Sequence, residues 1–397
     1  MTCWYPTMGA VRQVLVVYGT RPEAVKMAPV ITALRAIPEV RVSVAVTGQH
    51  RAILDQVNDL FGIVPDHDLD IAQPGQTLTD VTVRTLRGLE GILTDEKTDA
   101  VVVQGDTTTS TAAALAAFYA GIPVAHVEAG LRTDDRWNPY PEEVNRRLTT
   151  RLAELHLAPT ERARTALLEE GIPERDVVVT GNTVIDALHT VVDDVAGSFD
   201  EPALSGLTPR RPVVLVTTHR RESWGDPMRA TGRAVRRLAD AHPGADFVVP
   251  LHPNPMVREA LSPSLAGVAN VRLTEPLGYA DFALLLARSS LVLTDSGGAQ
   301  EEAPSLGRPV LVLRETTERP EGVERGLARL VGTDEERIVA EATALLRRPL
   351  PSRSPGEPLH RSPYGDGQAG PRCAAAIAAL VGVGRRLPDF EEPPPLR

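Results

Sequence analysis

Short apolar runs rich in valine and leucine recur along the 397-residue chain, with amphipathic stretches between them. The apolar runs lack polar alternation, which is typical of strands buried on both faces of a parallel sheet. Strands are predicted at residues 14–18, 42–46, 100–103, 124–127, 156–158, 177–180, 213–217, 247–250, 271–273, 291–294 and 310–313. Helices are predicted between them, for example at residues 110–119, 160–170, 228–241 and 334–345. This alternation predicts the α/β class, built from consecutive strand–helix units.

One stretch without sustained periodicity divides the predicted strands into two sets. Residues 195–211 are rich in glycine, proline and polar residues, so we expect a linker there. The domains predicted on either side are residues 11–194 and 212–365, followed by a last helix within 366–387. We expect residues 1–10 to be a disordered extension and the acidic, proline-rich residues 388–397 to be a disordered tail.

Composition narrows the class of partner. The net charge is −10 without a basic run, which argues against nucleic acid as the main partner. No apolar run is long enough to span a bilayer, and the first ten residues lack the layout of a signal peptide. The two cysteines, Cys3 and Cys373, are too few for a disulfide framework, so we expect a cytoplasmic protein. There is no metal-binding motif, dinucleotide fingerprint or P-loop, so no metal and no cofactor are predicted.

The segment VLVVYGTRPEAVKMAP, residues 14–29, predicts an anion site. It reads as a buried strand that breaks at Gly19 and runs into a helix, with Arg21 and Lys26 near the helix start. A helix N-terminus exposes unpaired N–H groups and a positive dipole end, and two cations there would favour a diphosphate. The alternative is an ordinary strand–helix junction with a surface arginine.

A second candidate anion site is LTDSGGAQEEAP, residues 293–304. Ser296, Gly297 and Gly298 form the turn from a predicted strand into a helix, and glycine allows the backbone to approach a phosphate closely. One carboxylate of the Glu301–Glu302 pair would be placed to accept both hydroxyls of a ribose. The alternatives are a tight turn with a capping serine and a solvated helix face.

Three carboxylates of the first half are candidates for acid–base chemistry. Asp106 and Glu128 follow successive predicted strands, and Glu142 follows Pro141 at a helix start. Acids at the carboxyl ends of neighbouring strands can face one ligand, and a third can complete the set. The alternative is that Asp106 and Glu142 are helix caps.

The amino-acid sequences of these segments resemble those of one family, the non-hydrolysing UDP-N-acetylglucosamine 2-epimerases. The matching blocks run in order from residue 11 to about residue 383: GTRPEAVKMAP, VVVQGDTTTS, HVEAGLRT, PYPEEVNRRLT, GNTVIDAL, THRRESWG, LTDSGGAQEEAPSLGRPVLVLRETTERPE and SPYGDGQA. The resemblance implies a GT-B fold, in which two Rossmann-like domains place parallel sheets toward a central cleft and the last helix crosses back to the first domain. It also implies a homodimer.

The resemblance further implies the substrate and the residue roles. The substrate pair would be UDP-GlcNAc and UDP-ManNAc, interconverted by elimination of UDP to 2-acetamidoglucal and re-addition, to supply ManNAc for cell-surface polysaccharide. The implied catalytic residues are Asp106, Glu128, Glu142 and His219. The implied substrate-binding residues are Arg21, Lys26, Phe282, Ser296, Gly297, Gly298, Glu302 and Arg319. The alternatives are a hydrolysing epimerase, which releases ManNAc and UDP, and a GT-B glycosyltransferase.

Some members of this family bind a second UDP-GlcNAc as an activator. The implied regulatory residues here are Gln49, His50 and His252. Ala52 stands where the family commonly has Gln or Glu, and alanine cannot form a side-chain hydrogen bond. We therefore expect weak or absent activation.

Overall fold

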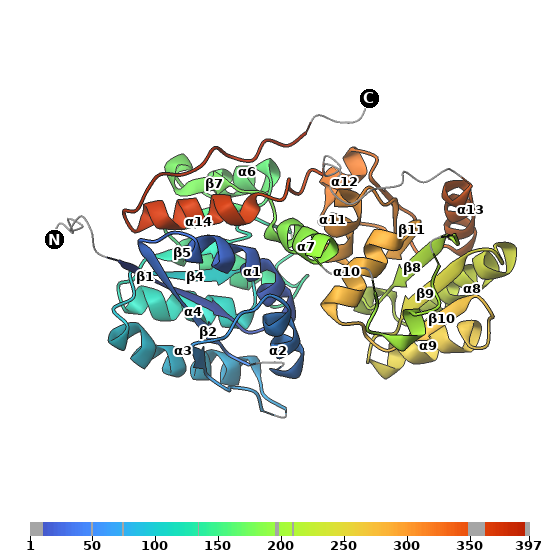
Figure 1. Cartoon of the computed structure of the whole chain (residues 1–397), viewed down its shortest axis with the longest axis horizontal. Coiled ribbons are helices and arrows are strands. Elements are labelled where there is room, and N and C mark those ends of the chain that lie inside the picture. Colours follow the sequence, from blue (N-terminus) through green and yellow to red (C-terminus); the bar gives the residue numbers. More distant parts are fainter. Residues whose placement is uncertain are drawn as a thin grey trace. The chain divides into compact units, whose positions relative to one another are not determined.

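The chain forms two compact α/β units (Figure 1). The computed structural model describes residues 11–48, 51–73, 75–133, 135–194, 198–208, 210–347 and 362–393. Unit 1 comprises Met1–Ala187 with Tyr364–Glu392, and unit 2 comprises Leu188–Pro363 with Pro393–Arg397. Their sheets are both parallel, as the apolar runs predicted, and each unit is described below by itself.

The sheet of unit 1 has seven strands in the order β3-β2-β1-β4-β5-β6-β7. The strands are β1 (Arg12–Tyr18), β2 (Val40–Val46), β3 (His67–Asp68), β4 (Ala100–Gln104), β5 (Val124–Val127), β6 (Leu155–Ala158) and β7 (Val177–Val179). Sequence reading missed β3 because a two-residue edge strand, His67–Asp68, has no apolar run to mark it. The central strands are buried on both faces, which explains why their sequences lack alternation.

Helices cover both faces of this sheet (Figure 1). They are α1 (Arg21–Arg35), α2 (Arg51–Leu60), α3 (Leu78–Asp95), α4 (Thr108–Tyr119), α5 (Glu142–Leu152), α6 (Glu161–Glu169), the start of α7 (Thr183–Asp194) and α14 (Ala369–Leu380). Leu15, Val17 and Val101 of the sheet pack with Leu89 of α3 and Ala113 of α4 in one apolar cluster. This packing holds the ends of the strands in fixed positions.

The return of the chain to unit 1 depends on a close helix contact. A Cβ on Gly370 would lie 2.8 Å from the backbone oxygen of Pro29, so only glycine lets α14 approach α1 this closely. Asp186 of α7 accepts the N–H groups of Gly370 and Ala369, at 2.7 and 3.2 Å. Because the start of α7 is held to α14 in this way, the boundary between the units falls inside α7, earlier than the predicted linker at 195–211.

The predicted disorder of the tail does not hold for residues 388–393. Phe390 is buried, and its N–H donates to the backbone oxygen of Val179 at 2.7 Å. The edge strand β7 therefore binds this segment, and composition alone carries no sign of such an edge contact. Residues 1–10 and 394–397 lie outside the described residues.

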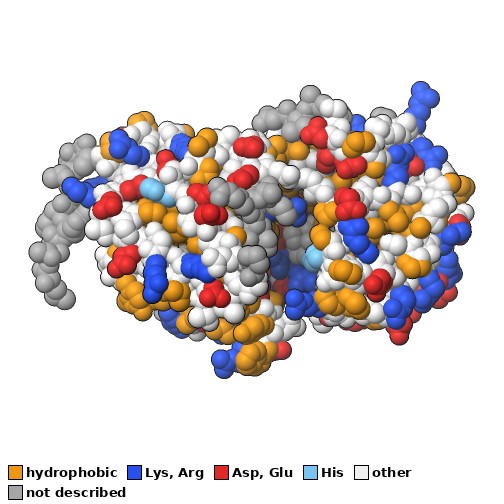
Figure 2. Space-filling model, turned by 90° about the horizontal axis from the view of Figure 1, so that it is seen from below, with side chains coloured by type: hydrophobic (Ala, Val, Ile, Leu, Met, Phe, Trp, Pro, Cys, Tyr) orange, Lys and Arg blue, Asp and Glu red, His pale blue; other side chains and the backbone are white. Residues whose placement is uncertain are grey.

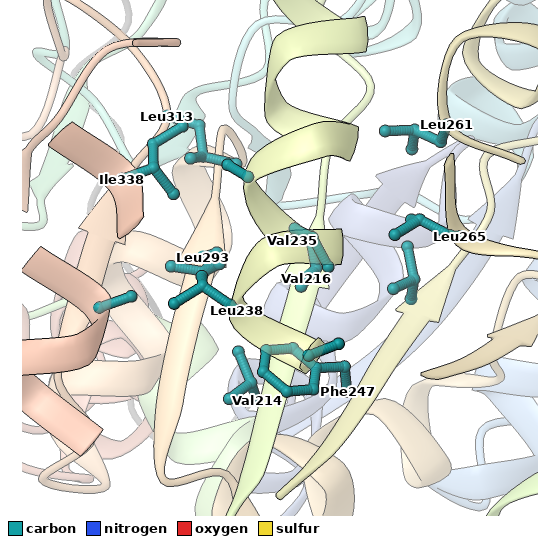
Figure 3. Packing of buried hydrophobic residues seen from close by; sticks show 14 of the residues in the cluster. Val214, Val216, Val235, Leu238, Phe247, Leu261, Leu265, Leu293, Leu313 and Ile338 are labelled. Atoms are coloured by element: carbon teal, nitrogen blue, oxygen red, sulfur yellow. The ribbon is translucent and has the colours of Figure 1, made fainter. Parts of the chain in front are cut away.

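The sheet of unit 2 has six strands in the order β10-β9-β8-β11-β12-β13. They are β8 (Val213–Thr217), β9 (Asp246–Pro250), β10 (Val271–Thr274), β11 (Leu291–Thr294), β12 (Val310–Val312) and β13 (Ala328–Leu330). The helices are α8 (Asp226–Ala241), α9 (Pro255–Leu265), α10 (Tyr279–Arg288), α11 (Gly297–Ser305), α12 (Pro320–Glu324) and α13 (Glu335–Leu346). Figure 3 shows the core, where Phe247 of β9 lies among Val214, Val235 and Leu238.

Both sheets reverse their strand order at one point. The reversal lies between β1 and β4 in unit 1 and between β8 and β11 in unit 2. Ligands of open parallel sheets bind outside the carboxyl ends of the strands at such a point. The segments that follow these four strands are therefore the expected position of a ligand site, and they contain most of the candidate residues predicted from the sequence.

Candidate active site

The turn after β1 is closed by a buried carboxylate that sequence reading overlooked. Glu23 accepts the N–H groups of Gly19 and Thr20 at 3.1 and 2.8 Å and the hydroxyl of Thr107 at 2.8 Å. Burial raises its pKa, while these hydrogen bonds oppose the rise. The pattern of threonine followed three residues later by glutamate is a capping box, which could have been recognised in the sequence. Glu23 thus uses donors that the sequence had suggested for an anion.

The two cations of this segment have different surroundings. Arg21 is exposed at the first position of α1. Lys26 forms an ion pair with Glu128, and both side chains are largely buried. The charge of Lys26 therefore compensates a candidate catalytic carboxylate, a contact that sequence spacing did not suggest.

Asp106 and Glu128 lie at the carboxyl ends of the neighbouring strands β4 and β5. Glu128 accepts hydrogen bonds from the side-chain amides of Gln104 and Asn182 as well as from Lys26. Its backbone φ of 63° is left-handed, a conformation that costs energy for a residue with a side chain. The site therefore holds Glu128 in a fixed and locally strained orientation.

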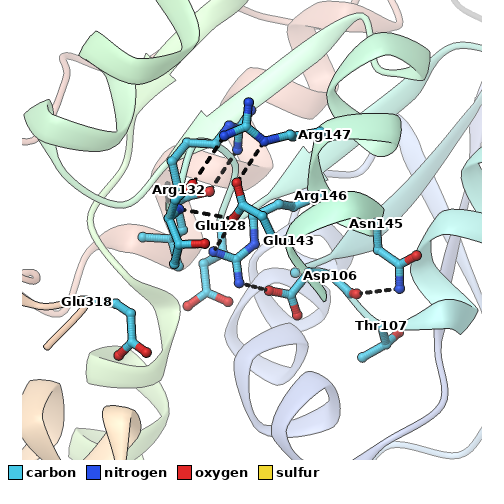
Figure 4. A network of polar contacts seen from close by, with 12 residues as sticks. Asp106, Thr107, Glu128, Arg132, Glu143, Asn145, Arg146, Arg147 and Glu318 are labelled. Atoms are coloured by element: carbon cyan, nitrogen blue, oxygen red, sulfur yellow. Dashed lines mark hydrogen bonds and ion pairs between the residues drawn. The ribbon is translucent and has the colours of Figure 1, made fainter. Parts of the chain in front are cut away.

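Asp106 experiences opposed influences (Figure 4). Its carboxylate pairs with the guanidinium of Arg146 at 2.5 Å, and Asn145 donates to its backbone oxygen at 3.0 Å. Burial and the negative charge of Glu128 raise the pKa of Asp106, whereas Arg146 lowers it, and the net direction is upward. The structure therefore brings Asp106 and Glu128 into one electrostatic environment, as predicted from their positions after successive strands.

The capping alternatives do not account for these carboxylates. The N-cap of α4 is Thr107, whose hydroxyl accepts the N–H of Ser110, and the N-cap of α5 is Pro141. Glu142 is the first residue of α5 and partly exposed, where the helix dipole favours a negative charge. Its neighbour Glu143 is fully buried and belongs to the framework, because it pairs with Arg147 at 2.7 Å.

A neutral histidine supports the turn that carries Asp106. His126 is fully buried, which lowers its pKa to about 3, and its Nε2 lies 2.7 Å from the backbone oxygen of Gly105. Gly105 has a φ of 66°, which suits glycine. His126 therefore donates a hydrogen bond to this turn and remains uncharged.

In unit 2, the candidate residues gather after β8 and β11, which pair in parallel with Thr294 opposite Thr217. His219 follows β8, and its Nδ1 lies 3.2 Å from the carboxylate of Asp295, which follows β11. Ser296 is the N-cap of α11, and its side chain makes no capping hydrogen bond. The N–H of Ser296 donates to the hydroxyl of Thr294 at 2.9 Å, but the Ser296 hydroxyl does not occupy the N–H groups that follow it in α11, which are the donors that an anion would need.

The glycine and glutamate positions of α11 are also explained. A Cβ on Gly297 would lie 3.1 Å from the guanidinium carbon of Arg319, so glycine leaves room for this cation. Arg319 pairs with Glu301 at 2.7 Å, and Glu302 accepts the hydroxyl of Tyr279 at 3.0 Å. Both glutamates are almost completely buried, so the alternative of a solvated helix face is wrong.

The structure also places two further candidate substrate-binding residues and one of the predicted regulatory residues. Gly298 is the second residue of α11, and Phe282 lies half-buried on α10, three residues after Tyr279. His252 stacks on His219 with ring centroids 5.9 Å apart. Gln49 and His50 lie outside the described residues, so the predicted regulatory set is only partly placed.

Among the described residues, no group of three or more His, Cys, Asp and Glu side chains could hold a metal ion. No helix in the described part of the chain is long and apolar enough to cross a membrane. Acidic and basic side chains are interspersed over the face shown in Figure 2.

Two parallel α/β sheets with charged residues at the switch point of each define a two-domain enzyme of the GT-B type. The family model described as UDP-N-acetylglucosamine 2-epimerase matches residues 32–378. A UDP-N-acetylglucosamine 2-epimerase of Salmonella typhimurium is 52% identical over 375 residues, which cover 93% of this chain and 98% of that protein. The chain belongs to the UDP-N-acetylglucosamine 2-epimerase family, as its sequence motifs predicted.

Solved structures agree with this assignment. The UDP-GlcNAc 2-epimerase from Neisseria meningitidis, bound to UDP-GlcNAc, is 46% identical with a TM-score of 0.82 and covers 90% of this chain and 97% of its own. The enzyme from Methanocaldococcus jannaschii, in complex with UDP-GlcNAc and UDP, is 32% identical with a TM-score of 0.76, over 92% of this chain and 99% of its own. The fold is therefore shared along almost the whole length of these relatives.

Proposed function

We propose that the protein is a non-hydrolysing UDP-N-acetylglucosamine 2-epimerase, which interconverts UDP-GlcNAc and UDP-ManNAc. The observation that carries the proposal is the coupled pair of carboxylates, Asp106 and Glu128, at adjacent strand ends in a member of this family. Relatives with bound UDP-GlcNAc support the choice of substrate.

The chemistry explains why carboxylates and cations are both needed. The C2 proton of the sugar is not adjacent to a carbonyl, so cleavage of the C1–O bond comes first and leaves positive charge at C1. UDP departs with the bonding electron pair, and a carboxylate removes the C2 proton to give 2-acetamidoglucal. Return of a proton to the other face of C2 and of the UDP oxygen to C1 yields the epimer. Asp106, Glu128 and Glu142 would act as acids and bases in these steps.

The residues of unit 2 would bind the UDP group. His219, Arg319, the Ser296 hydroxyl and the N–H groups of Gly297 and Gly298 would stabilise the leaving diphosphate, since preorganised donors are most effective where charge develops. Phe282 would lie against the uracil, and Glu302 would accept the ribose hydroxyls. In unit 1, Arg21 would contact the diphosphate, while Lys26 would hold Glu128 through their ion pair.

One experiment tests the reaction type. The protein is incubated with UDP-GlcNAc in deuterium oxide, and products are identified by NMR. We expect UDP-ManNAc that carries deuterium at C2. Complete retention of hydrogen at C2 would exclude the elimination route. Release of ManNAc and UDP would instead identify the hydrolysing subtype, and consumption only with an acceptor would identify a glycosyltransferase.

We also propose that the protein is a cytoplasmic homodimer that supplies ManNAc for cell-surface polysaccharide. Exposed apolar side chains of unit 1 support the dimer, because Phe118 and Tyr119 end α4, while Val83 and Leu148 lie on α3 and α5, which pack on it. Light scattering after gel filtration should give twice the 42.7 kDa chain mass. The weak activation by UDP-GlcNAc expected from Ala52 stays a prediction.

A further inference from the structure

Asp295 is a fully buried carboxylate at the point where the strand order of unit 2 reverses. The groups that donate hydrogen bonds to it belong to the segment after β8. It accepts the N–H groups of His219 and Arg220, at 2.9 and 3.0 Å, and the hydroxyl of Thr218 at 2.7 Å. It also lies 3.2 Å from Nδ1 of the His219 ring. Four donors converge on one carboxylate, so its position is fixed.

These contacts identify the proton on Nδ1 of His219. Burial would raise the pKa of Asp295, but the hydrogen bonds and the positive charge of His219 outweigh burial, and the pKa is lowered. An ionised carboxylate can only accept hydrogen bonds, so the nitrogen that faces it must carry a proton. Nε2 is then the ring nitrogen that remains for a ligand, and within the described part of the chain no hydrogen bond to Nε2 is recorded.

One face of the His219 ring packs against a second histidine. His252 stacks on His219 with an interplanar angle of 19°, and its Nδ1 accepts the N–H of Asn254 at 3.2 Å. Burial and the charge of His219 lower the pKa of His252. His252 therefore packs against the ring of His219, and these influences disfavour a positive charge on it.

We propose that Asp295 is a positioning residue. By accepting the Nδ1 proton it fixes the ring of His219 and supports the imidazolium form, whose Nε2–H donates to the diphosphate of the substrate. Asp295 directly precedes Ser296, so the same carboxylate links the histidine to the anion-binding turn of α11. An aspartate that holds a histidine in one tautomer is a recurrent arrangement in catalysis. The consequence for substrate depends on the function proposed above, whereas the state of the histidine ring does not.

The test uses Asp295→Asn in the full-length protein. The amide of asparagine can donate to Nδ1, so we expect the proton of His219 to move to Nε2. Nitrogen-15 NMR of histidine-labelled protein without ligand distinguishes the two tautomers, and His219→Gln assigns the signals. Asp246→Asn is the matched control, because Asp246 is also a buried carboxylate of unit 2. It begins β9, whereas Asp295 follows the end of β11, and it pairs with Arg211 and not with a histidine. Asp246→Asn should leave the His219 signals unchanged.

Kinetics complete the test. We expect Asp295→Asn to lower kcat roughly tenfold to a hundredfold, less than the ~10²–10⁴-fold typical of losing an acid–base group, because the histidine itself is retained. In the His219→Gln background, Asp295→Asn should cost nothing more, because its effect acts through the histidine. An unchanged tautomer in Asp295→Asn, or a further multiplicative loss in the double variant, would overturn the proposal. If the tautomer of His219 is inverted in Asp295→Asn but His219→Gln keeps full activity, only the role assigned to His219 is overturned.

Discussion

Asp106 is held between a desolvating environment, a neighbouring carboxylate and a paired arginine. Burial and Glu128 favour its neutral form, while Arg146 favours the ion. A carboxyl group whose pKa is raised by burial and by a neighbouring carboxylate holds a proton more readily than an exposed aspartate, which suits a group that transfers protons. At the residue scale, the proton transfer proposed for Asp106 would therefore depend on this balance of charges.

The three carboxylates should each be needed for turnover. We expect Asp106→Asn, Glu128→Gln and Glu142→Gln to reduce kcat by roughly a hundredfold or more, because each removes a group that transfers a proton. At least one should release 2-acetamidoglucal and UDP, since the second half-reaction alone would be blocked. Product analysis by NMR measures both effects. Glu259→Gln, an exposed change on α9, is the control, and near-normal rates in all three folded variants would contradict the assignment.

Arg146 should control the pH dependence through Asp106. Arg146→Met removes a cation that lowers the pKa of Asp106, so that pKa should rise, and the limb of the kcat/KM profile governed by Asp106 should move to higher pH. Arg146→Lys keeps the charge and should shift the limb less. Arg151→Met, an exposed change on the same helix, is the control. A superimposable profile for Arg146→Met would show that the ion pair has no part in catalysis.

At the scale of elements, the contact between α14 and α1 should limit the size of residue 370. Gly370→Ala places a Cβ within 2.8 Å of a backbone oxygen, so we expect the free energy of unfolding to fall by about 1–3 kcal/mol. Urea denaturation measures this change. Gly91→Ala is the matched control, because Gly91 lies in α3 with open space at its Cβ, and there alanine should stabilise by about 0.5–1 kcal/mol. Equal effects of the two changes would contradict a steric origin.

The anchor of α14 should also make stability depend on pH. Burial raises the pKa of Asp186 to about 6, its hydrogen bonds from Gly370 and Ala369 lower it, and the charge of Asp366 raises it. A carboxyl group whose pKa is higher in the folded state favours folding when protonated, so its contribution declines as pH rises from about 4 to about 6 and is constant above that. As pH rises across this window, the free energy of unfolding measured in urea should therefore fall for the wild type relative to Asp186→Asn. Parallel curves would contradict the shift.

At the scale of the whole molecule, the two units should respond differently to the nucleotide alone. UDP lacks the sugar, so we expect it to slow hydrogen exchange at residues 217–222 and 294–302 of unit 2 much more than at residues 104–110 of unit 1. At about 100 times Kd the protection should approach roughly a hundredfold where opening requires release of UDP. Exchange with mass-spectrometric detection measures this, with ADP as the control. Protection mainly in unit 1 would contradict the assignment of the UDP site.

The amino-acid sequence by itself determined the α/β class, most strands and the family. Buried parallel strands are continuous apolar runs, and the turns after them are marked by glycine, as at Gly19 and Gly297, so these features are local and readable. The positions of Asp106 and Glu128 after neighbouring strands followed from the same pattern. Short edge strands such as β3 have no apolar run to mark them, and the role of Glu23 is marked only by the spacing of a capping box, so neither was predicted.

Only the tertiary structure decided which charges meet. Lys26 pairs with Glu128 and Arg146 with Asp106 across long separations in sequence, and Asp295 meets His219 because β8 and β11 are neighbours. The ordering of Phe390 and the position of the unit boundary inside α7 likewise depend on contacts between distant segments. The physical reason is that hydrophobic periodicity reports the burial of each segment, whereas pairing of charges and the resulting pKa shifts depend on distances that arise only when the strands are ordered in the sheet.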